Sequence, residues 1–289
     1  MKKYKAIFFD WDGTAVTDRH ADPSDICSAM LPLLERGILL FIISGTTLEN
    51  ISGGELAKRF PASALQNLYM GLARGMHNFG FGSEGNPLWL TPPAYEDAVT
   101  GAVHDMAYGI HHRLLMEHHY PTDIVFTRPG YCKIDLLCDT SRTKLYLSGN
   151  EMEQISQRLQ AAGLSGGLGG LFAMSCEEGK KHGLEVKPTC DGKYLEVGLT
   201  TKSDNVNTFM EKLILPRGIT AAECCFWGDE YLELGQGIFG SDSQMITPLT
   251  RNGDFFDVND LPGERPAPVQ RLSGGPQRFL AFLKEQKNI

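Results

Sequence analysis

The sequence predicts an α/β protein in which a core with a parallel sheet is interrupted by an inserted α+β domain. Three observations lead to this prediction. Strand-like and helix-like segments alternate at both ends of the 289-residue chain, a pattern typical of parallel strands joined by crossover helices. The alternation breaks between residues 92 and 195. In addition, two apolar runs end directly in acidic residues, as expected where α/β sheets bind ligands.

The core is predicted to combine residues 1–91 with residues 196–289. In the first part, Asp22-Pro23 favours a helix start, because proline fits the first turn of a helix. Phe255-Phe256 and Gly274-Gly275-Pro276 are interpreted as structural. The apolar patterns predict core strands at 4–10, 38–43, 66–72 and 223–228, and core helices at 23–36, 47–60, 203–215 and 275–286.

The inserted domain is predicted over residues 92–195, after the linker-like Thr91-Pro92-Pro93. The stretch from Gly163 to Gly170 is expected to be a loop. It is not interpreted as a phosphate-binding loop, because such a loop follows a strand and contains a lysine. The patterns predict helices at 94–117 and 150–162 and strands at 123–128, 131–138, 171–176 and 193–199.

Composition limits the classes of partner. The net charge of −8 argues against nucleic acid as the main partner. No apolar run is long enough to cross a bilayer, and Lys2-Lys3 leads into a short strand and not into a signal-peptide core. The seven cysteines contain no Cys-x-x-Cys pair and fit reduced thiols in a cytoplasm; they are at positions 27, 132, 138, 176, 190, 224 and 225. A cytoplasmic protein without membrane or nucleic-acid partners is expected.

The run Tyr4 to Phe9 leads directly into Asp10-Trp11-Asp12-Gly13-Thr14. This places two carboxylates at the end of a buried strand, and the glycine allows a sharp turn there. One carboxylate can act as a nucleophile while the other transfers protons. A polar turn is the alternative interpretation, because Asp and Gly are common turn residues.

Three further elements follow in compatible order. Ser44 and Gly45 end the second strand, where a hydroxyl and free amides could hold a phosphate oxygen, although an ordinary helix cap would look the same. Lys202 precedes a predicted helix, where a cation is unfavourable unless an anion lies nearby. Asp229 follows the strand that ends in Trp227-Gly228. Carboxylates from separate strand ends are ligands suited to Mg²⁺.

Together these four elements resemble the haloacid dehalogenase superfamily of phosphotransferases, over a Rossmann-like core of about 170 residues. The insert between the Ser44 and Lys202 elements resembles the subgroup with a large α/β cap (C2 type, IIB), which includes Cof-like sugar-phosphate phosphatases and phosphomannomutase-like enzymes. The resemblance implies Asp10 as the nucleophile and Asp12 as the acid/base. It implies that Ser44, Gly45 and Lys202 bind phosphate. It also implies that Asp10, the backbone carbonyl of Asp12, and Asp229 hold Mg²⁺.

The identity of the last metal-side acid stays open in the sequence. Relatives carry an acid four residues after the first, which here is Glu233. However, the run from Gly240 to Met245 matches the end of the family motif and contains Asp242. Residues 231–239 are therefore interpreted as an inserted loop, with Asp242 preferred and Glu233 as the alternative.

In the insert, Arg128, Lys133 and Asp135 flank the predicted turn at Pro129-Gly130. Lys133 and Asp135 share one strand face and could bind substrate hydroxyls, although an exposed face would have the same pattern. The resemblance implies a Mg²⁺-dependent phosphatase acting on a small phosphorylated metabolite, most simply a sugar phosphate. The alternatives are a phosphomutase with the same aspartates and a ligand-sensing protein without turnover.

Overall fold

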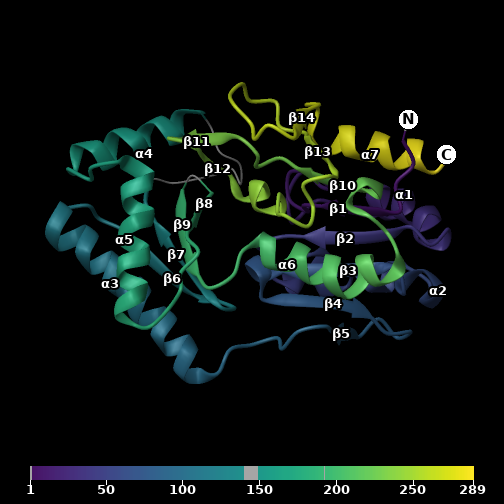
Figure 1. Ribbon diagram of the computed structural model, residues 1–289, viewed down its shortest axis with the longest axis horizontal. Helices are drawn as coiled ribbons and strands as arrows, with labels where there is room; N and C mark the ends of the chain where they lie inside the picture. The colour runs from purple at the N-terminus through teal and green to yellow at the C-terminus, as the bar shows by residue number, and fades with distance from the viewer. Residues whose placement is uncertain (1, 140–148, 192) are drawn as a thin grey trace. The chain divides into compact units, whose positions relative to one another are not determined.

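The protein is described by a computed structural model over residues 2–139, 149–191 and 193–289 (Figure 1). The chain forms two compact units. The first comprises Met1–Pro93, Lys202–Tyr231 and Asp242–Ile289, and the second comprises Ala94–Thr201 and Leu232–Ser241. Each unit has a hydrophobic core of its own.

The first unit is built on one eight-stranded sheet. The strands are parallel except at one edge, where β4 and β5 run antiparallel to their neighbours. The sheet and its helices confirm the predicted α/β class. In spatial order, the strands are β14 (Val269–Arg271), β13 (Asp254–Asp257), β10 (Cys224–Gly228), β1 (Ala6–Phe9), β2 (Leu39–Ile43), β3 (Leu68–Leu72), β4 (His77–Phe81) and β5 (Pro87–Trp89).

A row of aromatic rings crosses one face of this sheet. Phe255, Phe226, Phe8, Phe41 and Tyr69 are register partners on five neighbouring strands. Successive ring centroids are 4.7, 4.7, 4.2 and 5.1 Å apart, and each pair is stacked. Stacked aromatic pairs stabilise by more than their buried area alone, so this row fixes the register of the central strands.

Helices cover both faces of the sheet. Helices α1 (Ser24–Glu35) and α7 (Gly275–Gln286) contribute to the core that contains Ile7 and Phe9. Helix α6 (Lys202–Phe209) continues as a π-helical turn over Met210–Ile214 and packs against the aromatic face. The crossover helices predicted at 23–36, 203–215 and 275–286 therefore correspond to elements of the structure.

The helix predicted over 47–60 is wrong. That segment forms three 3₁₀ turns, Leu48–Asn50, Ser52–Gly54 and Leu56–Arg59, and a short α2 follows at Ala62–Leu65. Gly53 and Gly54 have φ angles of 66° and 79°. Such left-handed conformations interrupt an α-helix.

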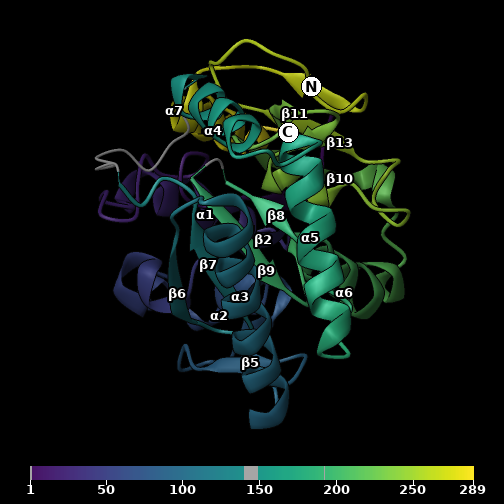
Figure 2. The same ribbon diagram turned by 90° about the vertical axis from the view of Figure 1, so that its left-hand side faces the viewer.

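The second unit contains an antiparallel sheet with helices against it (Figure 2). Ile134 and Val197 point from the sheet into a core shared with α3 and α5. The sheet order is β6 (Asp123–Arg128), β7 (Tyr131–Asp135), β9 (Tyr194–Gly198) and β8 (Thr189–Cys190), and the helices are α3 (Asp97–His118), α4 (Gly149–Ala161) and α5 (Gly167–Lys181).

The strand predicted at 171–176 is wrong, because these residues lie inside α5. The buried positions Leu168, Leu171 and Met174 recur at the spacing of one helix face. An apolar run this short does not distinguish a strand from a buried helix. The stretch from Gly163 to Gly170 was predicted to be a loop. The loop ends at Gly166, because α5 begins at Gly167.

The segment 231–239, marked by the sequence as an insertion, contains the hairpin β11 (Glu233–Gly235) and β12 (Ile238–Phe239). This hairpin belongs to the second unit, where Leu234 is buried in the core. Beside the start of α5, Leu234 and Gln236 line a cavity of about 550 Å³. Residues 232–239 are therefore an ordered part of the second unit, while Tyr231 belongs to the first.

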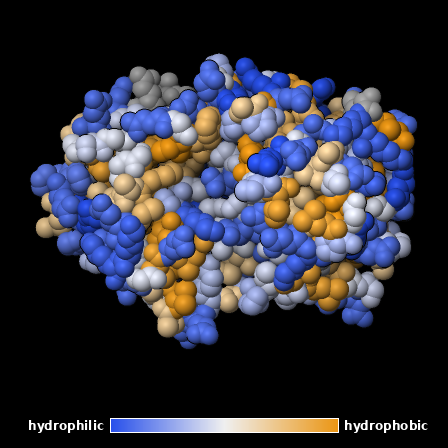
Figure 3. All heavy atoms as spheres, in the orientation of Figure 1, coloured by the Kyte–Doolittle hydropathy of each residue, from blue (hydrophilic) through white to orange (hydrophobic). Residues whose placement is uncertain are grey.

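The surface mixes polar and apolar residues. Figure 3 shows hydrophilic residues over much of one face, with smaller apolar areas between them. Within the described ranges, none of the helices combines the length and the apolar character needed to cross a membrane.

Candidate active site

The site lies at the carboxyl ends of three central strands. Strand β1 is flanked by β10 and β2, with Phe9 opposite Trp227 and Ile42. Asp10 follows β1 directly, and its N–H donates to the carbonyl of Trp227 over 2.9 Å. Asp229 and Ser44 follow the two neighbouring strands. The strand order thus brings together residues from three separate parts of the chain.

Three carboxylates form a buried cluster. Asp10, Asp229 and Asp242 each offer an oxygen, and these oxygens all lie within 4.8 Å of one another. Two glycines make the close approach possible. Gly13 has a φ of +85°, and a Cβ there would overlap the Asp229 carboxylate, while a Cβ on Gly228 would overlap the Asp242 carboxylate. Any larger side chain at either position would displace an acid.

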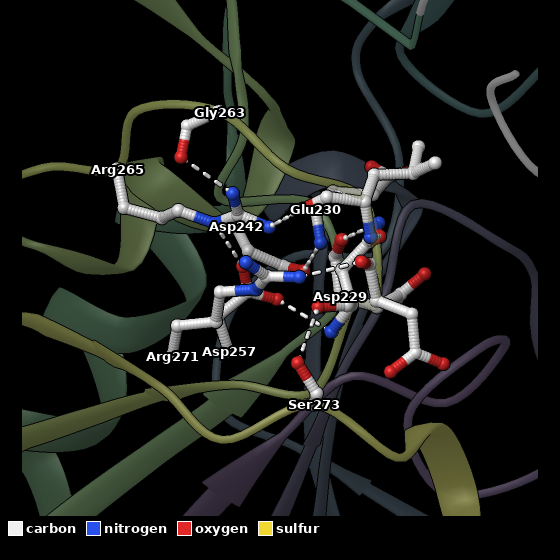
Figure 4. A network of polar contacts seen from close by, with 11 residues as sticks. Asp229, Glu230, Asp242, Asp257, Gly263, Arg265, Arg271 and Ser273 are labelled. Atoms are coloured by element: carbon white, nitrogen blue, oxygen red, sulfur yellow. Dashed lines mark hydrogen bonds and ion pairs between the residues drawn. The ribbon is translucent and has the colours of Figure 1, made fainter. Parts of the chain in front are cut away.

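Asp242 reaches the cluster because the chain returns to the first unit after the hairpin. Its Oδ2 accepts a hydrogen bond from the N–H of Glu230 at 2.8 Å, and its own N–H donates to the Glu230 carbonyl at 3.2 Å (Figure 4). Glu233 instead accepts a hydrogen bond from Gly237 within the hairpin. Within the described part of the chain, the acidic cluster includes Asp242 and not Glu233.

Lys202, the first residue of α6, lies between two of these acids. Its Nζ is 2.9 Å from Asp10 Oδ1 and 2.7 Å from Asp242 Oδ1. The lysine is buried. Burial acts to lower the pKa of Lys202, but the carboxylates of Asp10 and Asp242 outweigh it and hold that pKa well above its usual value. The anions that compensate for a cation at this helix start are therefore carboxylates of the protein itself.

The cluster carries more negative than positive charge. Burial raises the pKa of Asp10 well above its ordinary value. The positive charge of Lys202 acts to lower this pKa, and the negative charge of Asp242 raises it further. Burial likewise raises the pKa of Asp229, and the nearby Asp10 adds to this effect. The Thr14 hydroxyl donates to Asp229 Oδ1 at 2.9 Å. Buried acids with one neighbouring lysine need a further cation or protons.

Asp12 has a different environment. Its Oδ1 is buried without a hydrogen-bond partner, and its Oδ2 lies 3.8 Å from Arg19 Nη2. Burial raises the pKa of Asp12, and Arg19 partly opposes this effect. A carboxyl group with a raised pKa and a free oxygen keeps its proton to higher pH than an ordinary aspartate, which suits a group that donates and accepts a proton.

The loop after β2 presents hydroxyl groups. The side chain of Ser44 is buried, and its Oγ accepts a hydrogen bond from the N–H of Thr46 at 3.3 Å. Thr46 Oγ1 is also buried and has no hydrogen-bond partner. Short 3₁₀ turns follow this loop in place of the predicted α-helix, so no α-helix N-terminus supports anion binding here. Thr46 was not among the predicted site residues, although its position two residues after Ser44 is a usable signal.

The substrate candidates of the second unit lie on its sheet. Lys133 Nζ is 2.7 Å from Glu196 Oε1 and 3.4 Å from Asp191 Oδ2. Asp135 Oδ2 is 3.0 Å from Lys193 Nζ. These partners were not predicted, because they are distant in the chain from Lys133 and Asp135. Arg128 ends β6, and its Nε is buried without a hydrogen-bond partner.

This chain is similar to known proteins in its structure. No protein-family model matches the sequence, and a search of curated proteins finds no match. The IMP-nucleotidase of Plasmodium falciparum, in a structure with IMP bound, aligns over 99% of this chain and 67% of its own, with a TM-score of 0.62 and 13% identity. A protein from Eubacterium rectale aligns over 98% of each chain, with a TM-score of 0.54 and 15% identity.

Trehalose-6-phosphate phosphatase of Aspergillus fumigatus aligns over 99% of this chain and 93% of its own, with a TM-score of 0.55 and 15% identity. The chain has the haloacid dehalogenase fold. At these identities the similarity concerns the fold, and the chemistry must be argued from the residues of this chain.

Those residues are suited to a hard divalent cation. The donor set consists of carboxylate oxygens, which Mg²⁺ prefers over nitrogen or sulfur ligands. Asp10, Asp229 and Asp242 are close enough to share one ion. Burial and the neighbouring acids raise the pKa values of Asp10 and Asp229, and a bound cation would oppose both effects.

Proposed function

We propose that the protein is a Mg²⁺-dependent phosphatase that hydrolyses a small phosphorylated metabolite through an aspartyl-phosphate intermediate. The observation that carries this proposal is the meeting of Asp10, Asp229, Asp242 and Lys202 at the carboxyl ends of neighbouring strands. The solved structures with this fold include an IMP-nucleotidase and a trehalose-6-phosphate phosphatase by name, which supports the same class of reaction.

In the first step, a carboxylate oxygen of Asp10 attacks the phosphorus atom of the monoester. A bond forms between that oxygen and phosphorus, and the bond from phosphorus to the ester oxygen breaks. Asp12 donates a proton to the departing ester oxygen, so that an alcohol leaves. Its buried, unpartnered Oδ1 and raised pKa suit this role.

In the second step, Asp12, now a carboxylate, takes a proton from water. The water oxygen attacks phosphorus, the bond between phosphorus and Asp10 breaks, and inorganic phosphate is released. Lys202 and the Ser44 hydroxyl would bind phosphoryl oxygens, with Gly45 in the same loop. Positive charge near these oxygens stabilises the transition state of phosphoryl transfer.

Mg²⁺ would be held by the carboxylates of Asp10, Asp229 and Asp242 and by the backbone carbonyl of Asp12. When bound, it supplies positive charge that offsets the repulsion between a carboxylate nucleophile and a phosphate dianion. Asp242 is preferred to Glu233, because Asp242 is within the acidic cluster and Glu233 is used inside the hairpin.

The second unit is proposed to act as a cap of the C2 type that selects the substrate. It contains a sheet with polar side chains on one face, including Lys133 and Asp135. Such a surface can bind hydroxyl groups, which favours a sugar phosphate as substrate. Arg128 is included as a candidate for a second anionic group.

Phosphate release from a panel of sugar phosphates and IMP, with Mg²⁺ and with EDTA, tests this function. We expect free phosphate from one or a few members and none with EDTA. An isomeric sugar phosphate without net phosphate release would instead indicate a phosphomutase with the same Asp10 and Asp12. No turnover of any member, together with no binding of Mg²⁺, would overturn the proposal.

A further inference from the structure

The chain that follows β13 runs beside the chain that follows β10. The register pairs Gly228 with Asp257. The N–H of Val258 then donates to the carbonyl of Gly228 at 3.0 Å, and the Asn259 side chain donates from Nδ2 to the carbonyl of Asp229 at 2.8 Å. Asn259 therefore holds the main chain of Asp229, one of the three clustered acids.

Asn259 is fixed in this orientation by two further hydrogen bonds. Its own N–H donates to Asp257 Oδ1 at 2.8 Å, and its Oδ1 accepts from the N–H of Leu261 at 2.8 Å. Because one end of the amide faces an N–H and the other faces a carbonyl, a flipped amide would lose both contacts. The side chain can present only its NH₂ group to Asp229.

A buried ion pair closes the loop around Asn259. Arg265 Nε donates to Asp257 Oδ2 at 2.6 Å. The other guanidinium nitrogens donate to the carbonyls of Gly263 and Leu261 at 2.6 and 2.7 Å, as Figure 4 shows for Gly263. The side chain of Asp257 is fully buried and that of Arg265 is 6% exposed. Buried pairs with satisfied hydrogen bonds hold one geometry.

We propose that Asn259 is a positioning residue for the metal-side acids, with Arg265 as the residue that holds its loop. This inference rests on the proposed function. Asp229 lies beside Asp10 and Asp242, which repel it electrostatically. A main chain held by Asn259 resists that displacement before the cation binds. Residues that orient the ligands of a metal typically change its affinity by roughly 10- to 100-fold when removed.

The test is Asn259→Ala in the full chain, with the Mg²⁺ dissociation constant measured by calorimetry without substrate. We expect this constant to rise roughly 10-fold. In a phosphatase assay the half-saturating Mg²⁺ concentration should rise in parallel, while kcat at saturating Mg²⁺ stays within about threefold of wild type. A pure loss of stability would not move the metal affinity selectively.

Asn67→Ala is the matched control. Asn67 Nδ2 donates to the carbonyl of Leu34 at 2.9 Å in the same unit, and this contact is also partly buried. It should lower the unfolding temperature without changing the Mg²⁺ dissociation constant. Should Asn259→Ala not fold, Arg265→Lys provides a second test, because it keeps the charge but loses the guanidinium contacts to Gly263 and Leu261. It should also raise the dissociation constant, by a smaller factor.

Equal Mg²⁺ affinity in folded Asn259→Ala and wild type would overturn the positioning role and leave the proposed function intact. Weaker binding in the variant, in a protein that releases phosphate from no substrate, would support the positioning role and contradict the proposed function. A wild-type protein that does not bind Mg²⁺ would overturn both.

Discussion

Each unit of the protein has a lysine between two carboxylates, and the surroundings of these lysines differ. In the first unit, Lys202 is 2.9 and 2.7 Å from Asp10 and Asp242. In the second, Lys133 is 2.7 and 3.4 Å from Glu196 and Asp191. Considered as isolated ion pairs, the two arrangements would be difficult to distinguish.

The two sites differ in the charged groups that lie beside these ion pairs. Beside Lys202 the additional group is another acid, Asp229, whose pKa is raised by burial and by Asp10. Beside Lys133 the additional ion pair contains Lys193, and both lysines lie over the ring of Tyr194, at 5.1 and 5.4 Å from its centroid. The first arrangement has one lysine for three carboxylates, whereas the second has two lysines for three carboxylates and is more completely neutralised. Incomplete neutralisation, more than an ion pair itself, is the feature that indicates a ligand site.

The largest effect, on turnover, is expected for Asp10→Asn. We expect turnover to fall below about 1% of wild type, because an amide cannot attack phosphorus. The same change removes one of the mutually repelling charges, so the metal-free variant should unfold at a higher temperature than wild type. Phosphate release and thermal unfolding measure the two effects. A folded variant with more than about a tenth of the wild-type rate would exclude Asp10 as nucleophile.

A smaller effect is expected for Asp242→Asn. Loss of this carboxylate should raise the half-saturating Mg²⁺ concentration by roughly 10- to 100-fold. Glu233→Gln is the matched control and should change it less than about twofold, because Glu233 bonds only to Gly237 in the described hairpin. Mg²⁺ titrations of phosphate release compare the two. The reverse order of effects would make Glu233 the metal-side acid.

Lys133→Ala tests the role of the lysine in the second unit. If the cap sheet binds substrate, kcat/KM should fall about 10-fold for the preferred sugar phosphate and about twofold for p-nitrophenyl phosphate, which has no hydroxyl groups. The variant should also lose about 3 kcal/mol of stability, because Glu196 and Asp191 lose their cation. Equal changes in kcat/KM for both substrates, with the stability loss, would give Lys133 a structural role alone.

The smallest effect is a pH dependence of stabilisation by Mg²⁺. The pKa values of Asp10 and Asp229 are raised above the ordinary 3.8, so the folded protein binds more protons than the unfolded chain. Their contribution to metal-free stability is present below about pH 4 and is lost as the pH rises through the raised values. Mg²⁺ should therefore increase the unfolding temperature more at pH 8 than at about pH 5.

Thermal unfolding with Mg²⁺ or EDTA across this pH range measures the effect. Asp10→Asn should reduce the slope, because one of the titrating groups is removed. A stabilisation by Mg²⁺ that does not change with pH would contradict the proposal that these acids bind the ion in exchange for protons.

Much of the core was predictable because its signals are local. A buried strand that runs into Asp-x-Asp-Gly marks Asp10, and a buried strand that runs into Gly-Asp marks Asp229. Burial of apolar runs and sharp turns depend on neighbouring residues, which the sequence displays directly. Local signals also failed where they were ambiguous, as for residues 171–176 in α5 and residues 47–60 in the 3₁₀ turns.

The sequence by itself determined the α/β class and the strand-end acids. Only the tertiary structure decided that Asp242 meets Lys202, that the hairpin between Asp229 and Asp242 joins the second unit, and that Asn259 holds the main chain of Asp229. These contacts depend on strand order and on loops that return from another unit. They join residues that no sequence spacing relates, because the path between them is set by packing.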